Sequence, residues 1–237
     1  MLQDLNSGSN QVGLKINMKK TKTMFNKFIS KKQIHIQHTA IEEVEDYIYL
    51  GQLIKMDHRQ YDEVRRRVRS GWGAFGKLNE VMQSNMPLCL KRKVFNQCVL
   101  PAMTYGSETW SMTQKMEQRL RVTQHSMERS MLGITKRDRK TNEWIRSMTQ
   151  VDDIIQAVKQ KKWSWAGHLA RTSDGRWTKL ITEWIPRNGS RHPGRQKTRW
   201  RDEITKFLDV TWMRKAQDRS VWCHIGEAFT LQWVDHG

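Results

Sequence analysis

The sequence lacks long hydrophobic runs and contains few cysteines and prolines. No stretch of about 18 apolar residues is present, and the first residues have neither the basic nor the apolar block of a signal peptide. The 3 cysteines, Cys89, Cys98 and Cys223, are too widely spaced for a zinc ribbon and odd in number for a disulfide framework. We therefore expect a soluble protein of the nucleus or cytoplasm, with reduced thiols, no bound metal or other cofactor, and no membrane partner.

Acidic residues are scarce relative to basic ones. Lys and Arg number 42 against 24 Asp and Glu, which gives a net charge of +18 and a pI near 10.1. A field of this sign and size attracts polyanions. The composition therefore predicts a nucleic-acid partner, RNA or DNA, with an acidic membrane surface as the alternative that nothing further supports, and it favours no particular oligomeric state.

The spacing of apolar residues predicts a mainly α-helical fold with a small β-element at the N-terminus. Alternation at Ile34 and Ile36, and the aromatic run Tyr47–Leu50 that ends at Gly51, are typical of short strands. From Tyr61 onward the period changes to three and four residues, which is typical of amphipathic helices. The expected helices cover residues 61–78, 90–99, 114–132, 142–148, 152–171, 199–208 and 213–228.

Two apolar stripes and one proline give more detailed expectations. Pro101 is expected to kink or end the second helix. Gly133 and the charged loop Lys136–Lys140 mark a domain boundary, so we divide the chain into residues 1–60, 61–133 and 134–237. The stripes expected to be buried are Val64, Val68, Trp72, Phe75 and Leu78 on the first helix, and Leu90, Val94, Cys98 and Val99 on the second.

The sequence has no G-x-S-x-G, no Gly-x4-Gly-Lys and no H-E-x-x-H motif, so no catalytic residue is predicted. The adjacent carboxylates Asp152 and Asp153 could hold metal ions, as paired carboxylates do in two-metal enzymes. They stand directly before a helical pattern, where acidic side chains cap free amides, and we favour the capping interpretation.

The loop from Arg187 to Arg201 is the strongest physical candidate for a nucleic-acid contact. It is extended by proline and glycine, contains no acid, and carries guanidinium groups that match phosphate geometry; the alternative is a solvated loop that contacts nothing. The cations of the loop are Arg187, Arg191, Arg195, Lys197, Arg199 and Arg201.

Eight of the 11 tryptophans lie in the last third of the chain, and Trp163, beside Lys161 and Lys162, is the first candidate for an exposed indole that stacks on bases.

Several segments, in the same order along the chain, resemble the reverse transcriptases of non-LTR retrotransposons. The first resembles the palm segment after the catalytic hairpin (motif D), the second the primer grip, the next two the thumb, and the last three the C-terminal region of RTE-like and craniofacial-development-protein-like element copies. These segments are Gly13–Lys22, Tyr49–Gly51, Gly71–Leu78, Leu100–Trp110, Trp163–Arg171, Gly194–Trp200 and Ala216–Arg219.

The resemblance implies that 1–60 is a palm remnant with a primer-grip-like hairpin, 61–133 a thumb-like bundle and 134–237 the C-terminal region. The aspartates that bind magnesium in the intact family enzyme lie in segments that do not occur here, so the chain alone is expected to be inactive. A motif D lysine, Lys20 or Lys22, would lie near the leaving pyrophosphate. Further contacts to nucleic acid are expected from Arg65, Arg66, Arg69, Lys91, Lys93, Lys161 and Lys162.

Three hypotheses follow. The first is a retroelement-derived fragment that binds RNA or RNA/DNA hybrid without catalysis. The second is a part of an active RNA-directed DNA polymerase whose palm is encoded upstream, and the third is a relic without function. In the first hypothesis the palm strands lack their partners, so we expect local disorder or displacement in residues 1–40.

Overall fold

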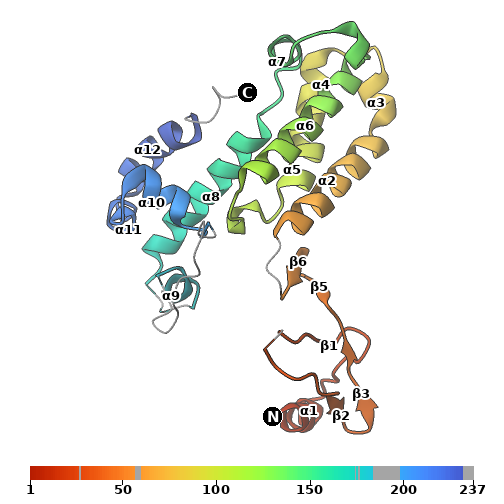
Figure 1. The fold of residues 1–237 in the computed structure, drawn as a ribbon, viewed down its shortest axis with the longest axis vertical. Helices are drawn as coiled ribbons and strands as arrows, with labels where there is room; N and C mark the ends of the chain where they lie inside the picture. The colour runs from red at the N-terminus through yellow and green to blue at the C-terminus, as the bar shows by residue number, and fades with distance from the viewer. Residues whose placement is uncertain (27, 57–59, 174, 176, 184–197, 232–237) are drawn as a thin grey trace. The chain divides into compact units, whose positions relative to one another are not determined.

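The computed structural model describes residues 1–26, 28–56, 60–173, 175, 177–183 and 198–231. Helices make up 62% of it and strands 8%, which confirms the mainly helical fold with a small N-terminal β-element (Figure 1). The chain forms two compact units, Met1–Glu63 and Val64–Gly237. The expected boundary near Gly133 lies inside the second unit, and the division into 61–133 and 134–237 stays a prediction.

The first unit contains one helix and three pairs of short strands. The β5–β6 hairpin turns through Leu50 and Gly51, which both have positive φ (48° and 77°), as a two-residue type I′ turn requires. Only Ile36 and Ile41 are buried apolar residues among those described in this unit, and α1 buries none, so its core is small. The elements are α1 (Leu2–Gln11), β1 (Lys22–Thr23) parallel to β4 (Glu42–Glu43), β2 (His35–Ile36) antiparallel to β3 (Thr39–Ala40), and β5 (Asp46–Tyr49) antiparallel to β6 (Gln52–Lys55).

The second unit is helical. The helix expected from Met213 is in fact two helices, because the Asp218 carboxylate accepts a hydrogen bond from the Val221 amide (3.0 Å) and starts a new one. In the described part of the chain no helix has the length and the apolar content needed to cross a membrane. The elements are α2 (Gln60–Lys77, which begins in the first unit), α3 (Asn79–Gln83), α4 (Leu88–Val94), η1 (Phe95–Val99), α5 (Leu100–Thr104), η2 (Ser107–Thr109), α6 (Gln114–Met131), η3 (Lys136–Asp138), α7 (Asn142–Thr149), α8 (Ile154–Arg171), α9 (Trp177–Glu183), α10 (Asp202–Leu208), α11 (Trp212–Lys215) and α12 (Arg219–Leu231).

The helix around Pro101 does not end at the proline. It continues to Thr104, because the turn before the proline, η1, is a wider π-helical turn. A π-turn shifts the hydrogen-bond pattern by one residue, so that the Leu100 amide bonds the Phe95 carbonyl and the proline, which has no N–H, enters at the start of α5.

Two details of the expected stripes are wrong. Trp72 is 40% exposed and contacts Phe75 edge-on, while Gly71 takes the buried position of that turn of α2. Leu90 and Cys98 are exposed because the α4–η1 segment buries Lys91, Phe95 and Val99. The buried face of this helix is therefore rotated by one residue from the expected one.

Helix α8 contacts α5 and α6 as well as α11 and α12, so it connects the two parts of the helical core (Figure 1). Its packing against α12 is reciprocal. The indoles of Trp163 and Trp222 stack with centroids 3.9 Å apart, and each donates its Nε1–H to the other's backbone carbonyl, at 2.9 and 3.1 Å. Trp222 lies against Gly167 of α8, and Trp163 lies against Gly226 of α12.

The same spacing, Trp-x3-Gly, thus occurs on both helices. A Cβ at Gly167 would lie 2.4 Å from Trp222 Nε1, and a Cβ at Gly226 would lie 2.5 Å from Trp163 Nε1. Each glycine therefore makes room for the indole of the opposite helix.

Candidate nucleic-acid interface

The positive charge is unevenly distributed between the two units. Residues 1–63 contain 9 basic and 8 acidic residues, a net charge of +1, whereas residues 64–237 contain 33 basic and 16 acidic residues, a net charge of +17. The field that attracts a polyanion therefore belongs to the helical unit.

A short turn between α6 and α7, here called the basic turn (Lys136–Lys140), concentrates this charge. Its four cations, Lys136, Arg137, Arg139 and Lys140, are all exposed. Hydrogen bonds fix its backbone: the Thr135 amide donates to Asp138 Oδ2 (2.6 Å), and the Arg137 amide donates to Thr135 Oγ1 (3.3 Å). The bonds from Thr135 also lower the pKa of Asp138, so the acid that holds the turn stays ionised.

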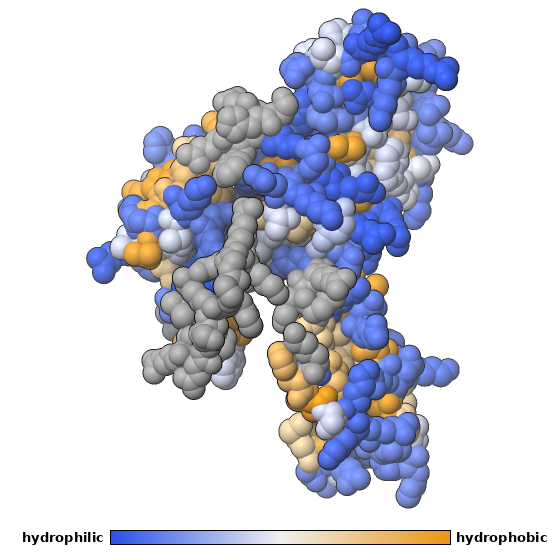
Figure 2. Space-filling model, viewed as in Figure 1, coloured by the Kyte–Doolittle hydropathy of each residue, from blue (hydrophilic) through white to orange (hydrophobic). Residues whose placement is uncertain are grey.

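Helix α7 follows the basic turn and is attached to its neighbours by side-chain hydrogen bonds. The Arg129 guanidinium of α6 donates to Asn142 Oδ1 (2.8 Å), and Arg92 of α4 donates to Gln150 Oε1 (2.6 Å). Lys140 Nζ lies 4.9 Å from the ring centroid of Trp144, whose side chain is 37% exposed. Figure 2 shows hydrophilic residues predominating on the visible face at the end of the helical unit where α7 lies.

Buried polar groups fix α7 against α6 and α8. Arg146 of α7 pairs with Asp153 at 2.5 Å, and Asp153 also accepts hydrogen bonds from the amides of Ile155 and Gln156, both at 2.8 Å. Asp153 is therefore the N-cap of α8, which confirms the capping interpretation for this residue. Asp152 is exposed.

Two further polar side chains of α6 have shifted pKa values. Glu128 is fully buried and accepts a hydrogen bond from the Thr149 hydroxyl (2.9 Å), and burial raises its pKa. Burial, followed by the charges of Arg146 and Arg129, lowers the pKa of His125 to about 4. His125 is thus neutral at pH 7 and adds no positive charge to this part of the helical unit.

The predicted contacts on the first unit and on α2 are partly exposed. Lys20 is exposed, but Lys22 forms an ion pair with Glu42. On α2, Arg65 and Arg69 are exposed and Arg66 is half-buried. On α4, Lys93 is exposed, whereas Lys91 is only 6% exposed.

In the helical unit, Lys161 is half-buried and Lys162 is buried. Lys161 Nζ donates to the carbonyl and the hydroxyl of Thr104, both at 3.0 Å. Lys162 is fully buried; its Nζ lies 2.7 Å from Glu203 Oε2 and donates to the Trp110 carbonyl at 3.2 Å, and burial lowers its pKa. The Lys162 ammonium is therefore not available to a phosphate unless this packing opens.

The expectation that Trp163 is an exposed base stacker is wrong. Its side chain is 5% exposed because both the ring and its N–H are used by Trp222. Phe207 and Phe229 cover the rest of the ring, with centroids at 5.9 and 4.6 Å.

Most of the predicted basic loop, Arg187, Arg191, Arg195 and Lys197, lies outside the described residues. Arg199 is exposed, and its amide donates to Asp202 Oδ2 at 2.6 Å. Arg201 donates to the Thr182 carbonyl at 3.3 Å.

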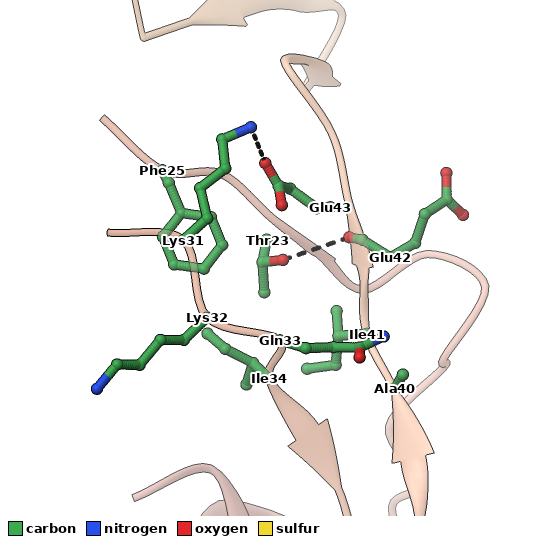
Figure 3. A pocket seen from close by; sticks show the side chains of 10 residues that line it. All are labelled: Thr23, Phe25, Lys31, Lys32, Gln33, Ile34, Ala40, Ile41, Glu42 and Glu43. Carbon is green, nitrogen blue, oxygen red and sulfur yellow. Dashed lines mark hydrogen bonds and ion pairs between the residues drawn. The ribbon is translucent and has the colours of Figure 1, made fainter. Parts of the chain in front are cut away.

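A hollow of about 340 Å³ lies in the first unit between Thr23–Phe25 and Ala40–Glu43 (Figure 3). Two of its charged groups face each other, because Lys31 is paired with Glu43. The hollow therefore presents less charge than its residue types suggest. Across the described ranges, no group of three or more His, Cys, Asp and Glu side chains could hold a metal ion.

The basic turn, expected only as a charged loop at a domain boundary, and Trp144 are not among the contacts predicted from the sequence. Two signals were available: four cations within five residues, and the Thr135-x-x-Asp138 pattern that fixes a turn. Near α7 the structure also places Arg92 of α4, which is half-buried and bonded to Gln150.

Fold and site together define a cationic, mainly helical protein with an exposed basic turn. No family model and no solved structure matches the chain. The chain is 38% identical over 239 residues to a Caenorhabditis elegans protein whose name describes it as transposon-derived and uncharacterized; the match covers 94% of this chain and 86% of the relative. The chain therefore belongs to this family of transposon-derived proteins.

Proposed function

We propose that the protein is a fragment of a non-LTR, RTE-like reverse transcriptase that binds RNA, RNA/DNA hybrid or DNA. The carrying observation is the net charge of +17 on the helical unit together with the fixed, exposed basic turn. The transposon origin and the ordered resemblance of segments from Gly13 to Arg219 support the lineage.

Binding is expected to be dominated by phosphate contacts. Lysine and arginine side chains that neutralise phosphates release counterions, so affinity falls steeply as salt rises. Because Thr135 and Asp138 hold the basic turn, its backbone is positioned before binding, and the ordering cost is confined to the cationic side chains.

Fluorescence anisotropy with labelled single-stranded RNA, RNA/DNA hybrid and duplex DNA, over a salt series, tests this proposal. The variant K136Q/R137Q/K140Q removes three charges from the basic turn and leaves Arg139, which has positive φ (50°), in place. The matched control K206Q/R214Q/R219Q removes three exposed charges from the region of α10 to α12.

The wild type is expected to bind all three probes at low salt with a negative log–log salt slope. The basic-turn variant should make that slope shallower by about 2 to 3, at roughly one per phosphate contact, and the control should change it much less. Absence of binding, or equal losses in the two variants, would contradict the proposed interface.

We also propose that the chain alone does not polymerise. In the resembled enzymes the aspartates that hold magnesium lie in segments that this sequence does not contain, and phosphoryl transfer requires those ions. Incubation with a primed RNA template, deoxynucleotides and magnesium should give no extended product. Extension that a chelator abolishes would overturn this part of the proposal.

A further inference from the structure

Three tryptophans are exposed in the described part of the helical unit. Trp72 is 40% exposed, with its ring against Phe75, and Trp177 is 77% exposed at the start of α9. Trp144 is 37% exposed and lies in the first turn of α7, directly after the basic turn. Of the three, Trp144 is the one that follows four exposed cations in sequence and has one of them over its ring.

The backbone that carries the Trp144 indole is fixed by hydrogen bonds. Its amide donates to Thr141 Oγ1 (3.2 Å), the cap of α7, and the bond between Arg129 and Asn142 ties the same turn to α6. Within the described part of the chain, Lys140 Nζ is the cation that lies over this ring. A flexible lysine can leave the ring for a phosphate, which would open the face of the indole to a base.

We infer that Trp144 and the basic turn form a site for an unpaired nucleotide, in which the base stacks on the indole and the adjoining phosphates contact Lys136, Arg137 and Lys140. This inference rests on the proposed function and specifies its ligand. A base inside a duplex has both faces covered by its neighbours, so it cannot stack on a side chain, whereas a base in a single strand can. The site therefore selects single-stranded over double-stranded segments.

The test compares W144A, W144F and the control W177A, which removes an exposed tryptophan from α9. The probes are a 12-nucleotide oligouridylate and a 40-base-pair duplex whose ends are a small part of its length. W144A is expected to weaken binding of the oligouridylate about 5- to 150-fold, as loss of one stacked base does, and binding of the duplex less than about 2-fold. W144F should retain most of the affinity, and W177A should match the wild type on both probes.

The outcomes separate this inference from the proposed function. Salt-dependent binding by the wild type with no effect of W144A would overturn the nucleotide site and leave the proposed function intact. Equal losses on both probes would also overturn it, because they would show a general phosphate surface. Absence of binding by the wild type would overturn both. Circular dichroism of W144A checks that the helical content is unchanged.

Discussion

The contact between α8 and α12 predicts opposite effects for the same substitution at two helical glycines. In G226A, the new Cβ would lie 2.5 Å from Nε1 and 2.7 Å from Cδ1 of Trp163. In G73A, on the exposed face of α2, the new Cβ meets no atom within 4 Å. Both changes place alanine in a helix, so they share the gain in helix propensity and differ in the space around the methyl group.

The magnitudes follow from that difference. Glycine to alanine in a helix gains about 1 kcal/mol, so G73A is expected to stabilise the protein by roughly 0.5–1 kcal/mol. In G226A this gain is opposed by overpacking of about 1–3 kcal/mol and by weakening of the Trp163 hydrogen bond, about 1 kcal/mol. We expect G226A to destabilise by about 1–3 kcal/mol in total, or several degrees in Tm for a chain of this size.

Urea and thermal unfolding, followed by circular dichroism, measure both variants against the wild type. G167A, whose Cβ would lie 2.4 Å from Trp222 Nε1, should behave like G226A because the packing is reciprocal. If G226A were as stable as G73A, the indole and the glycine could not be in contact, and the packing of α8 on α12 would be wrong.

Three further predictions concern titration, a buried ion pair and local stability. Since burial lowers the pKa of His125 to about 4, the unfolded chain binds a proton first as pH falls, so stability should decrease from about pH 6.5 to pH 4. After discounting for the partial exposure of His125, the loss of unfolding free energy is about 1 kcal/mol. In H125N, the urea midpoint should therefore depend less on pH than in the wild type. K162M leaves Glu203 without its ion-pair partner and should destabilise by about 2–4 kcal/mol, with part of the loss recovered in K162M/E203Q; a K162M protein with wild-type stability would refute the buried pair. Amide hydrogen exchange should be faster in residues 1–63, where the core is small, than in the helical unit, and uniform protection would contradict this.

The helices were largely predictable because their signals are local. The apolar period and the caps placed α6 and α8 within about two residues, and the carboxylate of Asp153 caps α8 as the sequence suggested. The turn at Leu50-Gly51 also followed from a glycine after an aromatic strand. Such features depend on residues within a few positions of each other.

The environments of Lys162 and Trp163 could not be read in the same way. Consecutive cations before Trp163 suggested an exposed segment, but Lys162 is buried because Glu203 lies 41 residues further along the chain. Trp163 is buried because of Trp222, 59 residues away. Partners at such separations leave no periodic signal, although the repeated Trp-x3-Gly spacing marks both helices once their pairing is known.

Because Trp163 packs against Gly226 and Trp222 packs against Gly167, a substitution at any one of these four positions disturbs the packing of the others. In a related chain, loss of one tryptophan would leave a cavity beside the facing glycine, and a side chain at either glycine would displace an indole. Among related chains that still fold, these four positions should therefore change together or not at all.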